Sequence, residues 1–342
     1  MSKMTIYKLA EELNMSPSMV SRALSPNGKV REDKRQIILE AAKKYDFTPN
    51  TFASRLSMDT IKIGILLSSR FPINTQYMLD GISEAYQSFK DYKIEYDVTT
   101  IENPHPDAEY IRQLLSKYAY YDGVIITGMS SNRFTEVIND FVAVQPQTVQ
   151  VQAINEKANC LFSSCHDEFV ASGLAAEFLH NCLRKSPRKN VLLFTGNMES
   201  ALHKKAAQAF LHHSEEFGLN VLDNIDMMDN AKYFEEILPD LINKYKDQVD
   251  GMYITSGISL PLCKNISKFG DDIPFVTFDI YDEIKKYMKE NVVSATIYQD
   301  VHNQMKKAFE ALVLCIIYGT IPPKKIYTDV SLVLKSNMDL FK

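Results

Sequence analysis

The feature that most constrains this fold is an internal repeat. The run Ile63-Gly-Ile-Leu-Leu-Ser is matched 127 residues later by Asn190-Val-Leu-Leu-Phe-Thr, and Ile94 and Val221 stand at the same offset. Two further pairs stand 128 residues apart: Y-D-G-V-I-I-T at 121–127 with V-D-G-M-Y-I-T at 249–255, and Pro146 with Pro274. Short β-rich runs separated by amphipathic helical stretches are typical of parallel α/β folds. The repeat therefore predicts two similar lobes in tandem, and one large sheet with fortuitous spacing is the alternative.

Strands are expected at the β-rich runs that follow Lys62. Parallel α/β lobes bind ligands at the carboxyl ends of their strands. Two such lobes predict a cleft that closes on a small molecule about a hinge. The predicted strands are 63–68, 93–99, 123–127, 148–151, 191–195, 220–225, 251–255, 275–278 and 293–297.

Charge is unevenly distributed along the chain. Residues 1–62 hold 11 Lys or Arg and 7 Asp or Glu, whereas the remainder holds 27 and 36, within a net charge of −5. A basic head on an acidic body predicts that the head alone meets nucleic-acid phosphates. Chance asymmetry is the alternative.

Composition sets the class of protein. A length of 342 residues predicts two or three domains, and 45% hydrophobic with 24% charged residues is typical of a soluble globular protein. The sequence has no apolar run near the ~18 residues of a membrane span, and its first residues have no apolar signal region. Five scattered cysteines fit reduced thiols. We expect a cytoplasmic protein without a membrane partner.

The head predicts three short helices. Thr5 is suited to cap the first, and Ser16 followed by Pro17 is a second helix start. A third helix is expected over 31–45, after a loop at 25–28. The inner faces are predicted to carry Ile6, Leu9, Ala10, Leu13, Val20, Ala23, Leu24, Ile37, Ile38, Ala41 and Ala42.

Two short helices joined by a tight turn and followed by a third form a helix-turn-helix layout. The second helix can lie in a DNA major groove, and Arg22 is its strong base reader because the guanidinium fork matches a guanine edge. The alternative is an ordinary helical bundle in which Arg22 is solvated. The outward residues of the second helix are predicted to be Pro17, Ser18, Ser21 and Arg22, and Thr5, Ser16 and Asn50 are further predicted DNA contacts.

These residues carry a specific resemblance. The stretches T-I-Y-K-L-A-E-E-L-N-M-S-P-S-M-V-S-R-A-L, R-Q-I-I-L-E-A-A-K-K-Y-D-F-T-P-N and A-x-x-L at 53–56 closely resemble the head of the lactose repressor (LacI/GalR) family over about residues 4–58. The resemblance implies a short hinge helix from Asn50 that forms when two subunits sit on DNA. In it Leu56 matches the minor-groove wedge, Ala53 the small groove-facing position, and Arg55 could contact phosphate. It also implies a homodimer on pseudo-palindromic double-stranded DNA.

The body is similar to periplasmic sugar-binding proteins and to the sensor body of the same family. The expected fold is therefore α/β, with an all-α helix-turn-helix head and a two-lobed, Rossmann-like parallel α/β body. Expected bounds are 1–49 for the head, 50–61 for the hinge and 62–342 for the effector-binding body. The resemblance implies three crossings between lobes, with a first lobe of about 62–163 and 298–325 and a second of about 164–297 and 326–342.

Candidate effector residues come from predicted strand ends and from the resemblance. The segment after the first strand offers an arginine for a polar group and a phenylalanine for stacking, and the resemblance implies a polar ligand contact at three further positions, two of them aspartates. The expected effector-binding residues are Ser68, Arg70, Phe71, Asn74, Asp167, Lys204, Ser256, Asp279 and Gln299.

Two departures from the family pattern leave the ligand class open. Ala206 stands where the family usually has an arginine, with Lys204 or Lys205 as flexible substitutes. The usual Asn-Asp pair falls on Thr255 and Ser256. A sugar or sugar derivative remains the expected effector, and a sugar phosphate, a less polar ligand, another metabolite or a protein partner is the alternative.

Catalytic and cofactor motifs are missing from the sequence. There is no phosphate-binding loop, no dinucleotide fingerprint and no metalloprotease or hydrolase signature. We therefore expect a transcription regulator, more specifically a repressor, that is not an enzyme and uses no cofactor or metal. A DNA-tethered sugar-modifying enzyme and a transport binding protein are the rival classes.

Overall fold

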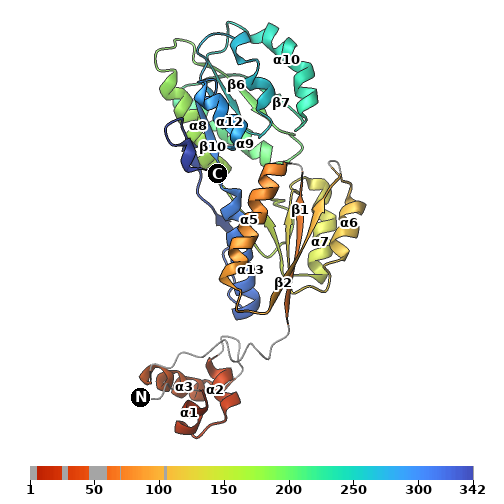
Figure 1. The fold of residues 1–342 in the computed structure, drawn as a ribbon, viewed down its shortest axis with the longest axis vertical. Coiled ribbons are helices and arrows are strands. Elements are labelled where there is room, and N and C mark those ends of the chain that lie inside the picture. The colour runs from red at the N-terminus through yellow and green to blue at the C-terminus, as the bar shows by residue number, and fades with distance from the viewer. Residues whose placement is uncertain (1–5, 25–29, 46–59, 70, 104–105, 342) are drawn as a thin grey trace.

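The computed structural model describes residues 6–24, 30–45, 60–69, 71–103 and 106–341. Within these ranges the side chains at 6, 7, 18, 21 and 22 lie outside the description. Figure 1 shows the three described parts of the chain: a small group of helices and two α/β lobes.

The head consists of three helices, α1 (Ile6–Glu12), α2 (Pro17–Leu24) and α3 (Glu32–Lys44). Ser16 Oγ accepts a hydrogen bond from Met19 N at 3.2 Å, so the hydroxyl caps the start of α2 as the sequence predicts. The predicted inner face of α3 needs one correction, because Ile37 is 48% exposed. The buried core residues are Leu9, Ala10, Val20, Ala23, Ile38 and Ala42.

The first lobe is a six-stranded sheet with helices on both faces. Its strand order is β11-β5-β4-β3-β1-β2, and every pairing in it is parallel. Helices α5 and α13 lie side by side on one face, as Figure 1 shows, and α6 and α7 cover the other. The elements are β1 (Ile61–Ser68), α5 (Pro72–Ser88), β2 (Ile94–Ile101), α6 (Ala108–Ser116), β3 (Gly123–Thr127), α7 (Thr135–Val144), β4 (Thr148–Val151), β5 (Ser163–Cys165), α13 (Val301–Tyr318) and β11 (Lys325–Tyr327).

The second lobe repeats this arrangement. Its strand order is β12-β10-β9-β8-β6-β7, parallel except for the β10–β12 pair. Helices α8 and α9 pack on one face and α10 and α12 on the other. The elements are α8 (Glu168–Cys182), β6 (Asn190–Thr195), α9 (Ala201–Phe217), β7 (Asn220–Asp226), α10 (Ala231–Tyr245), β8 (Gly251–Ile254), α11 (Leu260–Cys263), β9 (Phe275–Phe278), α12 (Asp282–Lys289), β10 (Ala295–Tyr298) and β12 (Ser331–Val333).

The two-lobed prediction is confirmed, and strands 127 or 128 residues apart occupy equivalent places in the two sheets. Strands β5 and β11 are not among the predicted strands, because three residues are too short to show a period. Their pairing places β11 in the first sheet. The chain crosses between the lobes after β5, after β10 and after β11.

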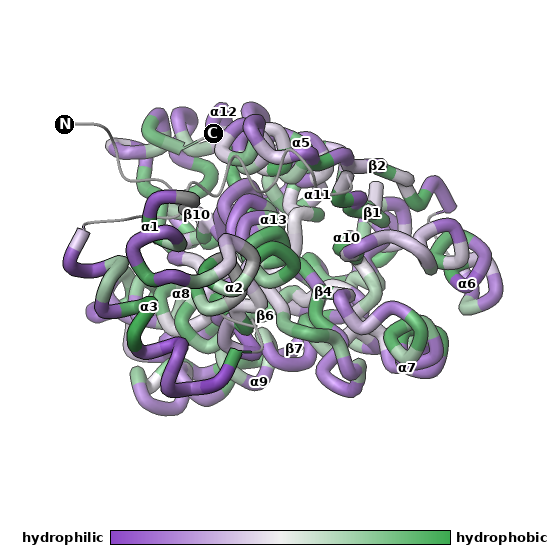
Figure 2. The backbone as a smooth tube through the Cα atoms, turned by 90° about the horizontal axis from the view of Figure 1, so that it is seen from below, coloured by the Kyte–Doolittle hydropathy of each residue, from purple (hydrophilic) through white to green (hydrophobic). Residues whose placement is uncertain are grey.

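Side-chain burial follows the layers. Figure 2 shows hydrophobic residues gathered toward the middle of the view, around β4, β6 and α13, and hydrophilic residues at the rim, as on α6. Close packing fixes the α5–α13 pair, since a Cβ on Gly81 would fall within 3.0 Å of the carbonyl oxygen of His302. No helix in the described ranges has the length and apolar character needed to cross a membrane.

Candidate ligand site between the lobes

Two adjoining cavities lie where the carboxyl ends of the two sheets face each other. Their volumes are about 60 and 130 Å³. The first lobe contributes the segment after β1 and the second lobe the start of α9 to both cavities. The residues that line both are Phe71, Asn74, Gln152, Leu202 and His203.

Asp279 is the central acidic group of the smaller cavity. It follows β9 with a left-handed φ of 67° and is 8% exposed. Its Oδ1 accepts a hydrogen bond from Gln299 Nε2 at 2.8 Å, and its Oδ2 accepts one from Asn74 Nδ2 at 3.3 Å. Burial raises the pKa of the Asp279 carboxyl, although the two amides favour its charged form. A strained backbone and a buried carboxylate at one residue mark a position shaped for binding.

His166 and Gln299 surround that carboxylate. Burial lowers the pKa of His166 to about 4, so the imidazole is neutral at pH 7 and does not neutralise Asp279. Within the described residues His166 Nδ1 and Gln299 Oε1 make no well-formed hydrogen bond. Gln299 is fixed from behind, because Gln304 Nε2 donates to its backbone oxygen at 2.6 Å. These polar atoms are available to a bound molecule.

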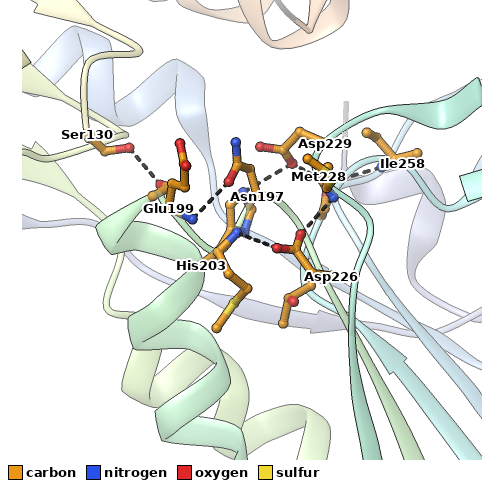
Figure 3. A network of polar contacts seen from close by, with 12 residues as sticks. Ser130, Asn197, Glu199, His203, Asp226, Met228, Asp229 and Ile258 are labelled. Carbon is orange, nitrogen blue, oxygen red and sulfur yellow. Dashed lines mark hydrogen bonds and ion pairs between the residues drawn. The ribbon is translucent and has the colours of Figure 1, made fainter. Parts of the chain in front are cut away.

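His203 and Asp229 form a buried pair in the second lobe. His203 Nε2 lies 3.2 Å from Asp229 Oδ1, and their side chains are 9% and 5% exposed. Asp226 holds the neighbouring loops, since its carboxylate accepts hydrogen bonds from the backbone N–H groups of Met198 and Met228. Figure 3 shows this network, with Ser130 of the first lobe in contact with the second lobe beside Glu199.

Direct contacts join the lobes around the cavities. Ser130 Oγ and Ser200 Oγ share a hydrogen bond of 2.7 Å, and the Asn74–Asp279 bond also crosses the cleft. A third contact is the ion pair between Glu156 and Lys205. A ligand that alters any of these groups would change the lobe angle.

The structure brings together six of the predicted effector residues. These six line the cavities: Ser68, Phe71, Asn74, Ser256, Asp279 and Gln299. Asp167 instead caps α8, accepting a hydrogen bond from Phe169 N at 2.9 Å, and lines a separate groove. Lys204 is exposed and lines neither cavity. Arg70 lies outside the described residues.

The predicted DNA-binding residues are described in part. Ser16 and Pro17 are exposed at the start of α2. Ser18, Ser21 and Arg22 lie in α2, but their side chains are outside the description. The remaining predicted residues lie outside the described ranges: Thr5, Asn50, Ala53, Arg55 and Leu56.

Sequence reasoning missed several polar lining residues as ligand candidates, among them Gln152, His166, His203 and Asp229. Gln152 and Asp229 follow β4 and β7, so the strand-end rule could have found them. His166 follows the three-residue strand β5, which the sequence does not predict. In the described part of the chain no group of three or more His, Cys, Asp or Glu is arranged to hold a metal ion.

Two parallel α/β lobes that meet across a polar cleft at their strand ends define a two-lobed small-molecule binding protein. The chain belongs to the periplasmic binding protein domain family, whose model matches residues 63–317.

Relatives by sequence include transcription regulators. The HTH-type transcriptional regulator pepR1 of Lactobacillus delbrueckii subsp. lactis is 25% identical over 262 residues, which cover 75% of this chain and 73% of that protein. Catabolite control protein A of Staphylococcus xylosus is 28% identical over 186 residues, covering 54% of this chain and 53% of that protein. The chain thus spans about half the length of the second relative.

Solved structures of sugar-binding proteins share the fold. The glucose-galactose binding protein GanP from Geobacillus stearothermophilus superposes with a TM-score of 0.71 at 17% identity, covering 82% of this chain and 99% of that one. The cleft residues, and not this likeness, must therefore decide what the chain binds.

Proposed function

We propose that the chain is a sequence-specific DNA-binding transcription regulator, more specifically a repressor, whose DNA affinity is set by a small molecule bound between its lobes. Residues 1–49 form the DNA-binding head, 50–61 the hinge and 62–342 the effector-binding body. The effector belongs to the class of sugars and sugar derivatives. The regulators found among the sequence relatives support this function over a transport role.

The observation that carries the proposal is the start of α2. The helix begins at Pro17, with Ser16 as its cap, and buries Val20 and Ala23 against the rest of the head. Residues at positions 18, 21 and 22 therefore share the opposite side of the helix by spacing. A short capped helix with serines and an arginine on that side fits a major groove.

Effector and DNA binding are coupled through the lobes. Two subunits present their heads to two half-sites, and the hinge segment of each orders when both are in place. The hinge-helix segment from Asn50 to Leu56 has only seven residues, too few for a stable isolated helix, so it depends on the partner and the DNA. A change in lobe angle alters the separation of the hinges and thereby the affinity for the operator.

Selection from random duplex DNA tests the proposal. The purified full chain is incubated with a random duplex library at moderate salt, and enriched sequences are compared with the starting library. Enrichment of a pseudo-palindromic site is expected. If no duplex is preferred over random duplex, with or without metabolites, the proposal is wrong and the chain acts as a binding protein without DNA recognition.

Two matched variants then test whether Arg22 contacts the DNA bases. Arg22→Ala and Lys43→Ala each remove one positive charge from the head. Arg22→Ala is expected to lower the preference for the selected site over random duplex by roughly 10–100-fold, the range of one bidentate base contact. Lys43→Ala, in the last turn of α3, is expected to weaken both duplexes equally. Equal effects of the two variants would contradict the assigned role of Arg22.

A further inference from the structure

Acidic side chains outnumber basic ones in the described lining of the cleft. Four carboxylates line the two cavities: Glu168, Glu199, Asp229 and Asp279. Arg133 is the one Lys or Arg in the described lining, and its exposed guanidinium lies 4.6 Å from the ring centre of Phe134. The smaller cavity has no Lys or Arg among its described residues. At the position of the family's arginine, its wall is the methyl group of Ala206.

Asp279 lacks a cationic partner in this lining. Both of its described side-chain contacts are to neutral amides, Asn74 and Gln299, and His166 beside it is neutral. A carboxylate has about four acceptor positions, of which these bonds use two. A buried charge without an opposite charge is costly, and a ligand that brings one removes that cost.

An aromatic ring borders the same space. A Cβ placed on Gly257 would lie 3.7 Å from Asp279 Oδ2 and 3.8 Å from Phe71 Cδ1. The carboxylate and the Phe71 ring therefore both face the open side of Gly257. An ammonium group between them would be attracted by the charge and by the face of the ring.

The hydrogen-bonding atoms around Asp279 also favour a ligand group that donates hydrogen bonds. Because Gln299 Nε2 donates to Asp279, the unpartnered Oε1 of Gln299 is an acceptor. Neutral His166 has one donor and one acceptor nitrogen, and its ring lies within hydrogen-bonding reach of the Gln299 side chain. Acceptors next to a carboxylate favour a ligand group that donates several hydrogen bonds. They disfavour phosphate, which has acceptor oxygens and negative charge.

We propose that the effector carries a protonated amine, held by Asp279 between Gln299 and Phe71, and that its class is the amino sugars rather than neutral sugars or sugar phosphates. This rests on the proposed function in so far as the cleft is the effector site. It makes the proposed function more specific, because it assigns a positive charge to the effector.

Calorimetry and thermal-shift measurements on the full chain test the charge of the ligand. They compare amino sugars with related sugars that lack the positive charge. D-glucosamine, D-galactosamine and D-mannosamine are compared at pH 7 with their neutral parents, their N-acetyl forms and the parent 6-phosphates. At least one amine is expected to bind about tenfold or more tightly than its parent. N-acetylation, which removes the charge, is expected to abolish the gain. Equal or tighter binding by a parent or a phosphate, or no binding by any amine, overturns the inference.

Variants test which residues contact the amine of the effector. Asp279→Asn is expected to remove the preference for the amine over its neutral parent, while circular dichroism checks that the variant is folded. Phe71→Leu keeps an apolar side chain and is expected to weaken the amine more than the parent. Arg112→Ala removes a positive charge from α6, outside both cavities, and is expected to leave amine binding unchanged. A loss of amine binding in this last variant contradicts the inference.

The two proposals fail separately. A neutral sugar that binds the cleft and changes operator affinity would refute the amine and leave the regulator in place. Failure to enrich any duplex would refute the regulator, whichever sugar binds.

Discussion

Two glycines of the second lobe, of which Gly257 lines the cleft, offer a matched test of how this lobe is packed. Gly196 follows β6 and Gly257 follows β8, and neither has the positive φ that would strain an alanine. A Cβ on Gly196 would fall within 3.0 Å of both His203 and Asp229, whereas one on Gly257 meets its nearest neighbours at 3.7 Å or more. Gly196→Ala should therefore disrupt the buried pair, and Gly257→Ala should fit.

The loss of stability in Gly196→Ala can be estimated from the side chains that the new methyl group displaces. His203 and Asp229 are both almost fully buried, so neither side chain can swing into solvent. Overpacking a filled site costs about 1–3 kcal/mol. Separating two buried hydrogen-bonding groups adds about 1–3 kcal/mol. Each kcal/mol corresponds to roughly 2–4 °C in Tm for a unit of about 150–250 residues, which is nearer the size of one lobe than of the 342-residue chain.

Thermal unfolding of the full chain, followed by circular dichroism, measures the difference. Gly196→Ala is expected to lower Tm by roughly 5–15 °C at the conversion just given. Gly257→Ala is expected to stay within roughly 2 °C of the parent chain, the effect of less than one kcal/mol. Equal Tm values for the two variants would refute the packing described around Gly196.

Three further outcomes are expected. Because burial lowers the pKa of His166 from 6.5 to about 4, stability should fall as pH drops through that window. The loss is up to roughly 3 kcal/mol at about 1.4 kcal/mol per pH unit. In urea titrations His166→Gln should lack this slope, and an unchanged slope would disprove the assignment. Lys205→Ala should change Tm by less than roughly 2 °C, because Lys325 still pairs with Glu156 and partly exposed ion pairs contribute little. Leu56→Ala should weaken the selected operator about tenfold or more and leave random duplex unaffected, as a lost minor-groove wedge requires.

The repeat made the body predictable because each lobe is built from local periodicity. Buried parallel strands such as Gly123–Thr127 are apolar throughout, and this pattern survives in a sequence read without a structure. Strand ends in such folds supply ligand groups, and this rule together with the family resemblance predicted Asn74, Asp279 and Gln299, which do line the cavities. Short elements such as β5 could not, because three residues show no period.

Other outcomes depend on contacts between distant parts of the chain and could not be predicted from local spacing. Ile37 has the spacing of an inner residue, yet the packing of the head leaves it exposed. Asp167 has the chemistry of a ligand contact, yet the start of α8 uses its carboxylate as a cap. Its neighbour His166 turns into the cleft instead. Neither outcome is encoded within a few residues of the position concerned.

The sequence alone determined the number of lobes, the strands that build them and the helices of the head, because these follow from the spacing of apolar residues along the chain. Tertiary structure decided that Asn74 meets Asp279 across 205 residues of chain and that His203 is paired with Asp229. Which carboxylate is left without a cation depends on these meetings. The partners of these residues are fixed by the packing of one lobe against the other.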